Sequence, residues 1–342
     1  MEKSKYSRLE FMKNATMAGI GISLLPSLVS FSRREKKTFI TGKRVGIIGL
    51  DTSHSSTFTR LLNDPEENAD FLGYKVIAAC PRGSMDIKSS VNQIPGCTEK
   101  VKKYGVEIVN SVDELLPKVD VVLLNTNDGR LHLEQATQVI KAGKPVFVDK
   151  PFAASYKDAV AIFRFAHENK VPVFTSSSIR YLSAAQEVVA GKVGKVLGAD
   201  TFSPAILEKT HPDLYWYAIH GVELLFTVMG IGCVKVSRYQ TNDTEYVVGI
   251  WKDGRIGAFR GTRSGEHQYG GIAFGEKGNI VLGPSEGYKA LVMTIVNFFE
   301  TGIPPVREEE TLEIFAFMDA ADRSKKKNGK AVNLRSVVND LA

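Results

Sequence analysis

Residues 43–54, which read Lys43-Arg44-Val45-Gly46-Ile47-Ile48-Gly49-Leu50-Asp51-Thr52-Ser53-His54, contain the most informative pattern in this chain. The apolar run is typical of a buried parallel strand, and Gly49 stands where the first glycine of the dinucleotide-binding motif G-x-G-x-x-G belongs. The second and third glycines would fall at Asp51 and His54. Because the second glycine lets the backbone approach a pyrophosphate, an aspartate there adds bulk and negative charge. The stretch therefore predicts a Rossmann-type strand and turn with an altered phosphate loop.

Length and charge place the chain among ordinary globular proteins. Its 342 residues are 43% hydrophobic, which suits two domains with separate cores. The formal net charge is +6, but residues 1–37 hold eight Lys and Arg against three Glu, a net of +5 that leaves +1 for the rest. A nearly neutral body predicts no nucleic-acid partner.

The amino terminus has the pattern of an export signal over residues 1–32. A basic start precedes an apolar stretch from Ala15 to Ser30, which is short for a membrane span but suits a signal sequence. The segment from Ser7 to Lys13 resembles a twin-arginine signal in which Leu9 replaces the second arginine. We expect an exported, periplasmic protein whose mature form has no membrane span. A short membrane-associated or disordered amino terminus on a cytoplasmic protein is the alternative.

The three cysteines, Cys80, Cys97 and Cys233, are too few and too scattered for a disulfide framework or a zinc site. Cys80 ends an expected strand and Cys233 begins one, so both are expected to be buried small hydrophobic residues. No metal site is predicted.

From residue 43, short apolar strands alternate with helical segments, which predicts a parallel sheet covered on both faces. Ser111 and Ser155 begin capping-box patterns that predict helix starts. We expect a Rossmann-type, doubly wound α/β domain over residues 38–178. Its strands are expected at 45–50, 76–80, 107–109, 119–124, 146–148 and 171–174.

The pattern changes after residue 178. A helix at 183–193 precedes closely spaced alternating segments, which predict an open, mostly antiparallel sheet. Residues 179–342 are therefore expected to form an α+β domain for substrate binding and oligomerisation, with a cleft between the two domains. Its strands are expected at 198–202, 233–239, 246–251, 255–260 and 271–274, and its last helices at 287–301 and 308–326.

Several ordered motifs resemble the Gfo/Idh/MocA family of glucose-fructose oxidoreductases and inositol dehydrogenases. The segment from Gly143 to Pro151 is similar to the family's G-K-x-V-x-x-E-K-P, with Asp149 replacing glutamate. His132 begins an H-x-x-x-A pattern, and residues 302–306 are similar to the family's carboxyl-terminal region. The resemblance runs from about residue 43 to the end and implies an oxidoreductase of sugars or polyols, assembled as a homo-oligomer through the exposed face of the second sheet.

The resemblance implies two catalytic residues. Lys150 matches the lysine of E-K-P, which polarises a hydroxyl and carries its proton as hydride leaves. Orienting a ribose is the alternative role for this lysine. His220 stands for the histidine of a D-x-x-x-H pattern, although Trp216 replaces the aspartate. Arg180, His211 and Trp216 are expected to line the substrate cleft.

The implied cofactor is NADP or NAD, held tightly enough to survive export. The acidic residue that should hold the adenosine ribose is missing after the second strand, where Arg82 and Ser84 can grip a 2′-phosphate and favour NADP. A simple polar turn is the alternative. The expected cofactor-binding residues are Gly49, Asp51, Thr52, Ser53, His54, Arg82, Asn125, Thr126, Asn127, His132, Asp149 and Lys150.

The leading hypothesis is therefore an NAD(P)-dependent oxidoreductase that transfers hydride to or from a sugar or polyol. The alternative is a family member without redox chemistry, namely a carbohydrate-binding protein, a lyase or a hydrolase. Asp51 in the phosphate loop and the missing ribose acid favour that alternative. A third possibility retains the cofactor for transient oxidation that assists glycosidic cleavage.

Overall fold

The structure, a computed structural model, describes residues 43–340. These residues all belong to one compact unit of the chain. The expected export leader, residues 1–32, lies outside the described residues. Among residues 43–340, no helix combines the length and apolar character needed to cross a membrane.

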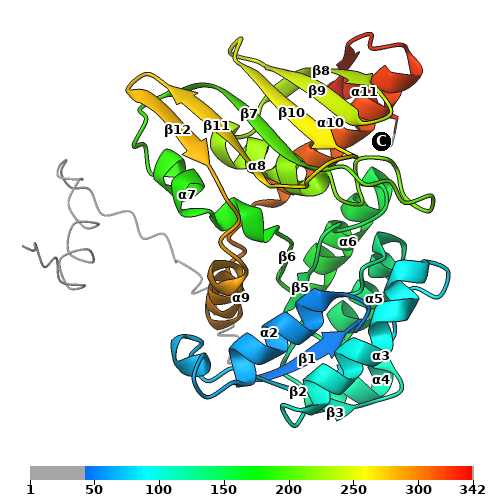
Figure 1. Cartoon of the computed structure of the whole chain (residues 1–342). Coiled ribbons are helices and arrows are strands. Elements are labelled where there is room, and N and C mark those ends of the chain that lie inside the picture. Colours follow the sequence, from blue (N-terminus) through cyan, green and yellow to red (C-terminus); the bar gives the residue numbers. More distant parts are fainter. Residues whose placement is uncertain (1–42, 341–342) are drawn as a thin grey trace, which may run out of the picture. The chain divides into compact units, whose positions relative to one another are not determined.

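The first domain contains the predicted parallel sheet (Figure 1). Its six strands lie in the order β3-β2-β1-β4-β5-β6, and every neighbouring pair is parallel. The order reverses between β1 and β4, which places a crevice at the carboxyl ends of these two strands. The strands are β1 (Arg44–Ile48), β2 (Lys75–Cys80), β3 (Glu107–Ile108), β4 (Val121–Leu124), β5 (Val146–Val148) and β6 (Val173–Phe174).

Helices cover both faces of this sheet, as a doubly wound fold requires. One face packs against α4 (Val112–Leu115), α5 (Gly129–Lys141) and α6 (Tyr156–Asn169). The other packs against α2 (Ser53–Asn63), α3 (Lys88–Lys102) and α9 (Lys289–Thr301). Short 3₁₀ turns η1 (Asn68–Asp70), η2 (Leu116–Lys118) and η3 (Ser178–Tyr181) complete this half.

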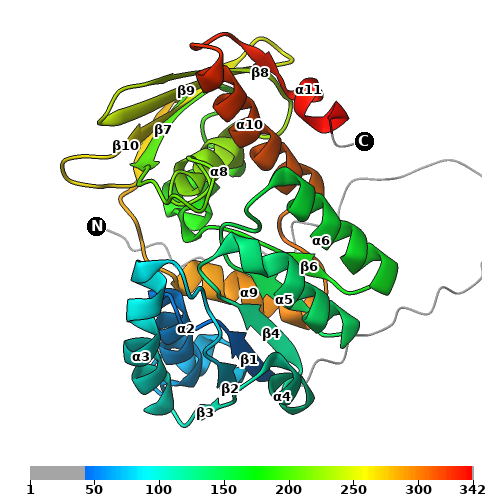
Figure 2. The same ribbon diagram turned by 90° about the vertical axis from the view of Figure 1, so that its right-hand side faces the viewer.

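Helix α9 follows residue 178 by more than a hundred positions, yet it packs on the first domain (Figure 2). Val292 and Phe298 share a buried cluster with Ile47 of β1 and Phe58 of α2. The second half of the chain thus contributes to the core of the first domain.

The predicted helix starts are present. Ser111 Oγ accepts a hydrogen bond from the Glu114 N–H at 3.1 Å, and Ser155 Oγ accepts one from the Asp158 N–H at 3.0 Å. These caps satisfy backbone donors that the first turn of a helix leaves free.

The second domain is built on a seven-stranded mixed sheet in the order β12-β11-β7-β10-β9-β8-β13. Its pairs are antiparallel except β7 with β10, which are parallel. The strands are β7 (Val196–Pro204), β8 (Cys233–Gln240), β9 (Thr244–Trp251), β10 (Ile256–Thr262), β11 (Gly270–Gly275), β12 (Gly278–Leu282) and β13 (Val332–Asn333).

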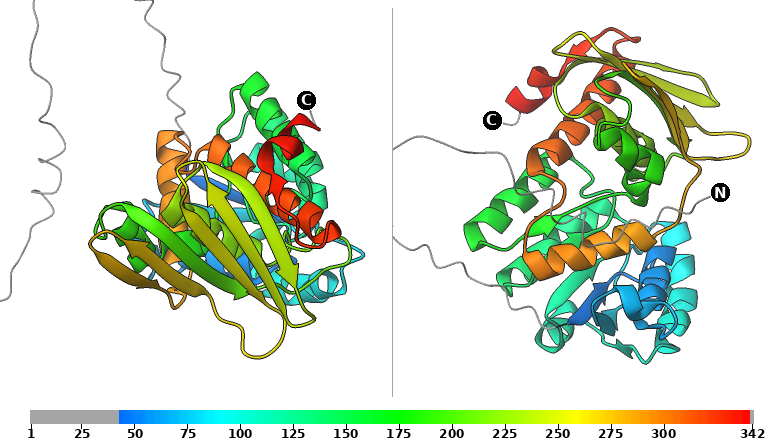
Figure 3. Two further views of the ribbon diagram at one scale, coloured as in Figure 1. Left: turned by 90° about the horizontal axis from the view of Figure 1, so that it is seen from above. Right: turned by 90° about the vertical axis from the view of Figure 1, so that its left-hand side faces the viewer.

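Helices lie on only one face of this sheet, and Figure 3 looks onto the other face in its left view. The helices are α7 (Ser183–Val189), α8 (Ile219–Met229), α10 (Glu308–Lys326) and α11 (Leu334–Asn339). The expected helix at 183–193 ends at Val189 because Gly191 and Gly194 adopt positive φ angles of 86° and 71°. Strand β12 was not expected from the sequence.

Candidate active site

The carboxyl ends of β1, β4 and β5 bring the sequence-predicted residues to one edge. The N–H of Asn125 donates to the carbonyl of Ile48 at 2.7 Å, and the N–H of Asp149 donates to the carbonyl of Leu124 at 2.8 Å. Gly49, Asn125 and Asp149 therefore stand side by side at the crevice where α/β folds bind ligands.

Gly49 is required by close packing. Its φ is +90°, and a Cβ there would lie 2.3 Å from the Thr126 backbone nitrogen. The loop after β4 thus lies directly against the turn after β1, so this glycine serves the fold as well as any ligand.

Asp51 fills the space between two neighbouring loops. Its carboxylate is fully buried and accepts hydrogen bonds from the N–H of Ser84 at 3.2 Å and of Asn127 at 3.1 Å. Gly83 makes room for it, since a Cβ there would lie 2.4 Å from Asp51 Cγ. Burial raises the pKa of Asp51, and the two backbone donors oppose that rise. The position that normally admits a pyrophosphate therefore holds the protein's own carboxylate.

His54 stands at the third glycine position, in the first turn of α2. Thr52 caps this helix by accepting the His54 N–H, and Ser53 is its exposed first residue. The His54 ring is buried, with Nδ1 2.5 Å from Asp149 Oδ2 and Nε2 3.0 Å from Tyr288 Oη. The imidazole therefore joins the end of β5 to the residue that precedes α9.

Asp149 and Lys150 follow β5 and are both buried. Burial alone would raise the pKa of Asp149, but the charges of His54 and Lys150 hold it below its ordinary value. Burial lowers the pKa of Lys150, and the Asp149 carboxylate opposes that shift. Lys150 Nζ lies 5.4 Å from the centre of the Tyr217 ring, a cation–π contact. Within residues 43–340, its amino group has no hydrogen-bond acceptor and is available to a ligand.

His220 lies at the start of the apolar helix α8 and takes part in the same cluster. Its Nδ1 is 2.6 Å from Ser177 Oγ, so a serine orients the ring in place of the aspartate that Trp216 replaces. Burial lowers the pKa of His220 well below the ordinary value, and the charges of Lys150 and His54 act in the same direction. The imidazole is therefore neutral at neutral pH.

Arg180 makes two ion pairs. Its Nε lies 2.7 Å from Glu223 Oε1 and its Nη2 lies 2.6 Å from Glu310 Oε1. Glu223 also accepts the Ser177 N–H at 2.9 Å. The guanidinium thus braces the segment that orients His220, and its role as a substrate ligand stays a prediction.

His211 and His132 connect loops around the cluster. His211 Nε2 accepts the Gly129 N–H at the start of α5, at 3.2 Å, and its ring packs against Trp216 with centroids 4.9 Å apart. His132 lies between carbonyl oxygens, with Nε2 2.7 Å from that of Thr126 and Nδ1 3.3 Å from that of Phe152. These contacts support the loops, and roles in binding substrate or cofactor stay predictions.

The loop after β4 carries an unpaired polar group. Neither Nδ2 nor Oδ1 of the buried Asn125 side chain has a hydrogen-bond partner among the described residues. Thr126 Oγ1 donates to the Arg82 carbonyl at 3.4 Å, and Asn127 Nδ2 donates to Ser90 Oγ at 3.4 Å. A buried amide without partners is uncommon and suits a ligand that supplies both a donor and an acceptor.

Beyond Asp51, a hollow of about 730 Å³ opens at the carboxyl end of β2, lined by residues that include Arg82, Ser84 and Asp86. Both residues predicted to hold a 2′-phosphate have acidic neighbours there. Arg82 pairs with Glu134 at 3.0 Å, and Ser84 Oγ donates to Asp86 Oδ1 at 2.8 Å. Hydrogen bonds from Arg130 and Ser84 lower the pKa of Asp86 to about 2, so this carboxylate is ionised.

Three half-buried tyrosines complete the cluster and were not identified from the sequence as site residues: Tyr217 before α8, Tyr269 before β11 and Tyr288 before α9. The Tyr269 ring lies edge-on to His220, with centroids 5.4 Å apart. Burial raises the pKa of Tyr269 and of Tyr288 to about 12. The three tyrosines come from distant segments without a common spacing, which is why the sequence did not identify them. Only Tyr217 could have been suggested, because it follows the predicted site residue Trp216.

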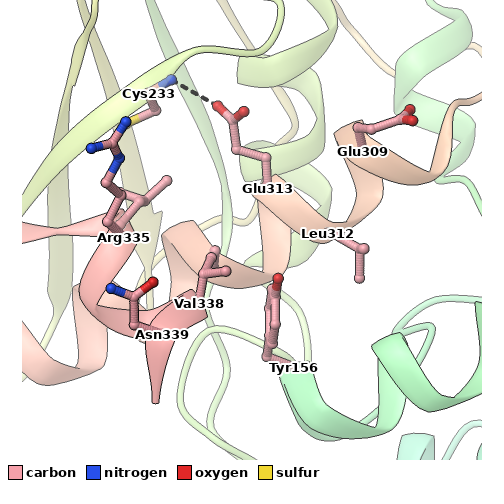
Figure 4. Close-up of a pocket in the computed structure, with 10 residues that line it drawn as sticks. Tyr156, Cys233, Glu309, Leu312, Glu313, Arg335, Val338 and Asn339 are labelled. Carbon is pink, nitrogen blue, oxygen red and sulfur yellow. Dashed lines mark hydrogen bonds between the residues drawn. The ribbon is translucent and has the colours of Figure 1, made fainter. Parts of the chain in front are cut away.

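A separate hollow of about 560 Å³ lies between α6, α10 and α11 (Figure 4). Tyr156, Leu312, Glu313 and Arg335 line it, and none of the sequence-predicted site residues do. Glu313 uses one carboxylate oxygen to accept the N–H groups of Gly232 and Cys233. This hollow is a structural junction away from the candidate site.

Among residues 43–340, no group of three or more His, Cys, Asp or Glu is placed to hold a metal ion. All three cysteines are free and buried, as expected for Cys80 and Cys233.

Comparison with known proteins agrees with this geometry. Residues 43–177 match the family described as "Oxidoreductase family, NAD-binding Rossmann fold", GFO_IDH_MocA. The first domain therefore matches the Gfo/Idh/MocA oxidoreductase family. The resemblance noted in the sequence is thereby confirmed, and the parallel sheet with its switch point is the family's nucleotide-binding domain.

Curated relatives match part of this chain. A 1,5-anhydro-D-fructose reductase of Ensifer adhaerens is 33% identical over 105 residues, covering 29% of this chain and 31% of that protein. An uncharacterized oxidoreductase of Streptococcus pneumoniae is 28% identical over 143 residues, covering 39% of this chain and 38% of that protein. The match spans only about a third of the length of these relatives.

Solved structures extend the likeness to both domains. A putative myo-inositol dehydrogenase from Sinorhizobium meliloti superposes with a TM-score of 0.70 at 16% identity, covering 86% of this chain and 100% of that one. The scyllo-inositol dehydrogenase from Lactobacillus casei with bound NAD(H) and scyllo-inositol gives 0.66 at 17% identity, covering 85% and 99%. These likenesses show the shared fold.

Proposed function

We propose that this protein is an NAD(P)-dependent oxidoreductase that transfers hydride to or from a sugar or polyol. The observation that carries the proposal is the buried amino group of Lys150 at the carboxyl end of β5, beside the neutral imidazole of His220 and under the Tyr217 ring. A lysine amino group that makes no hydrogen bond to a carboxylate, and a histidine held by a serine, suit proton exchange with a substrate hydroxyl.

The residues present fit both halves of a dinucleotide. The unpaired amide of Asn125 lies at the switch point, where it can bind the nicotinamide half. The hollow beside Arg82 lies after β2, where the adenosine half belongs. Between these halves, Asp51 holds the Ser84 and Asn127 N–H groups and competes with a pyrophosphate for them. Binding is expected despite this competition, with the Asp51 side chain displaced or protonated.

The choice between NADP and NAD depends on the hollow after β2. Arg82 supports NADP if it leaves Glu134 for a 2′-phosphate. The ionised Asp86, which holds Ser84 Oγ, repels that phosphate and instead suits the hydroxyls of an NAD ribose. Titrating the protein with NADPH and with NADH decides between them, and Arg82→Ala weakens NADPH binding selectively if the phosphate interpretation is right.

The chain's own residues supply the acid–base chemistry. The Lys150 ammonium can donate a hydrogen bond to the reacting oxygen and polarise it, and its lowered pKa makes transfer of its proton easier. His220, held by Ser177, can exchange a proton with a neighbouring hydroxyl through its other ring nitrogen. When a nicotinamide is bound, it supplies the hydride chemistry.

The non-redox alternative, a carbohydrate-binding protein, lyase or hydrolase, rests on the Asp51 carboxylate in the phosphate loop. Native mass spectrometry of the purified protein separates the two. A released dinucleotide, or binding of added NAD(P)H, supports the oxidoreductase. A protein that holds neither supports the alternative.

The catalytic assignment is tested by Lys150→Ala, with the exposed Lys141 at the end of α5 as the control position. Turnover is measured with NAD(P)(H) and inositols or 1,5-anhydro-D-fructose, the compounds that the names of related proteins suggest. We expect Lys150→Ala to lower kcat by about 100-fold or more with the melting temperature retained. Lys141→Ala should match the wild type. Near-normal turnover in Lys150→Ala would contradict the assignment.

Assembly into a homo-oligomer belongs to the same proposal. The helix-free face of the second sheet exposes a group of apolar side chains, namely Tyr239, Ile250, Ile256, Ile272 and Val281. Exposed apolar patches of this kind mark interaction surfaces. Sedimentation of the wild type and of Ile256→Lys tests it, because a monomeric wild type contradicts the assembly.

Export with a retained cofactor completes the proposal, supported by the basic and apolar pattern of residues 1–32. The mass of the protein recovered from the periplasm tests it. Loss of the leader supports export, and an intact chain found only in the cytoplasm contradicts it.

A further inference from the structure

A buried hydrogen-bonded chain leads from β5 to the active-site cluster. Asp149 Oδ2 lies 2.5 Å from His54 Nδ1, and His54 Nε2 lies 3.0 Å from Tyr288 Oη. The three residues come from the end of β5, the first turn of α2 and the residue before α9. The His54 and Tyr288 rings are also in edge contact, with centroids 4.7 Å apart.

The direction of these hydrogen bonds follows from the charge of Asp149. Its lowered pKa keeps the carboxylate ionised, so it can only accept, and His54 Nδ1 carries the proton. The relay uses the form of the ring in which Nε2 carries no proton, so that Tyr288 donates its O–H to it. An Asp–His–Tyr chain of this kind fixes the tautomer and the orientation of the ring.

Tyr288 ends this chain. Its phenol is half-buried, and Tyr217 and Tyr269 contribute to the rise of its pKa. Tyr217 is also the ring that covers Lys150 Nζ, and Tyr269 contacts His220. Asp149, at the other end of the chain, precedes Lys150 directly in the sequence, so the chain adjoins the proposed catalytic lysine.

We propose that Asp149, His54 and Tyr288 form a proton relay in which Tyr288 exchanges a proton with the substrate hydroxyl. The inference rests on the proposed function and adds a catalytic tyrosine to it. Because the pKa of Tyr288 is raised to about 12, the phenol stays protonated at neutral pH and needs a base behind it, which His54 provides.

In the oxidation direction, the substrate O–H bond breaks and its proton passes to Tyr288 Oη. The proton that Tyr288 carried moves to His54 Nε2, and the resulting imidazolium is stabilised by the Asp149 carboxylate. The electron pair left on the substrate oxygen forms the carbonyl as hydride leaves to the nicotinamide acceptor. Reduction runs through the same transfers in reverse.

Several titratable groups surround His54 and must be considered in any pH profile. Those in direct contact are Asp149 and Tyr288. The charges of His54 and Lys150 act on His220, and Tyr217 and Tyr269 act on Tyr288.

The hydrogen bonds are tested by ¹⁵N NMR of histidine-labelled full-length protein without cofactor. Tyr288→Phe keeps the ring and removes the hydroxyl, so the His54 Nε2 resonance should move to the position of an acceptor nitrogen without a donor. Tyr269→Phe is the matched control and should leave His54 unchanged. Unaltered His54 resonances in Tyr288→Phe overturn the relay.

Kinetics then test whether the reaction uses the relay. Tyr288→Phe and His54→Gln should each lower kcat by about 100-fold with little change in KM, and the double variant should lose no more than either single one. The relay is overturned if the double variant loses kcat by the product of the two single losses. It is also overturned if either single variant keeps kcat within twofold of wild type.

Failure of the proposed function is a different result. A wild type that binds no NAD(P)H and turns over no substrate contradicts the oxidoreductase, while the NMR comparison still decides whether the proton chain exists.

Discussion

Two side chains occupy positions where the dinucleotide motif has glycine, and both are bound to neighbouring loops. Asp51 reaches the loops after β2 and β4, and His54 reaches the loop after β5. The carboxyl edge of a parallel sheet presents unpaired backbone N–H groups in its loops, so a carboxylate there is stabilised much as a bound phosphate would be. The altered motif therefore builds an internal network in place of open space.

Replacing Asp51 with glycine tests whether this network competes with a cofactor. We expect Asp51→Gly to bind NAD(P)H more tightly, because the Ser84 and Asn127 N–H groups become free for a pyrophosphate. The same change should lower the free energy of unfolding by about 1–3 kcal/mol, since two buried donors lose their acceptor. Calorimetric titration and urea denaturation measure the two effects.

Asp51→Asn is the matched control, because an amide keeps the volume and loses the charge. It should fall between wild type and Asp51→Gly in affinity. Unchanged affinity in both variants would mean that the loop does not contact phosphate.

At the scale of elements, helix α8 positions His220 by packing tightly on the second sheet. A Cβ on Gly221 would lie 2.4 Å from Phe259 Cε2 of β10 and 3.0 Å from Ser203 Oγ of β7. The glycine lets the helix approach the sheet closely, which carries the adjacent His220 to Ser177. The position of His220, the proposed catalytic histidine, thus depends on a packing distance between a helix and a sheet.

Two glycine substitutions in helices should therefore act with opposite sign. Gly221→Ala should lower the free energy of unfolding by about 1–3 kcal/mol through overpacking, and should lower kcat as His220 shifts. Gly96 lies in the exposed middle of α3, with nothing within 4 Å of an added methyl group. Gly96→Ala should therefore raise the free energy of unfolding by about 0.5–1 kcal/mol. Thermal and urea unfolding of both variants measure this. A Gly221→Ala protein as stable as Gly96→Ala would refute the packing argument.

At the scale of the whole molecule, three buried histidines connect stability to pH. Burial lowers the pKa of His132, His211 and His220 in the folded protein. The unfolded chain therefore binds more protons below the ordinary histidine pKa of about 6.5. Their contribution to stability is complete above that pH. It is lost as the pH falls through the lowered pKa values of these histidines in the folded protein.

His132→Asn isolates one of these contributions. Between pH 7 and pH 5, the free energy of unfolding should fall less steeply in this variant than in wild type, by up to about 1.4 kcal/mol per pH unit. Urea denaturation across this range measures the slopes. The exposed His267 provides the comparison, and His267→Asn should keep the wild-type slope. Equal slopes in His132→Asn and wild type would contradict the assignment.

Local patterns predicted most of the first domain and placed Lys150 directly after one of its strands. The apolar runs around Val45 and Val146, the capping serines Ser111 and Ser155, and the segment ending in Lys150 each carry their signal within a few residues. The predicted helix at 308–326 matches α10, and β10 lies one or two residues from its expected bounds. At Val189 the helix ended earlier than expected, because a glycine with positive φ follows.

What the sequence by itself determined is the succession of strands and helices along the chain and the residues that follow each strand, because periodicity and turn chemistry act over short stretches. Only the tertiary structure decided the partners of those residues. His54 contacts Asp149 and Tyr288, which are 95 and 234 residues away in the sequence. Ser177 contacts His220, which is 43 residues away. These contacts form where segments distant in the sequence pack around one cleft, and such packing leaves no spacing in the sequence from which it can be read.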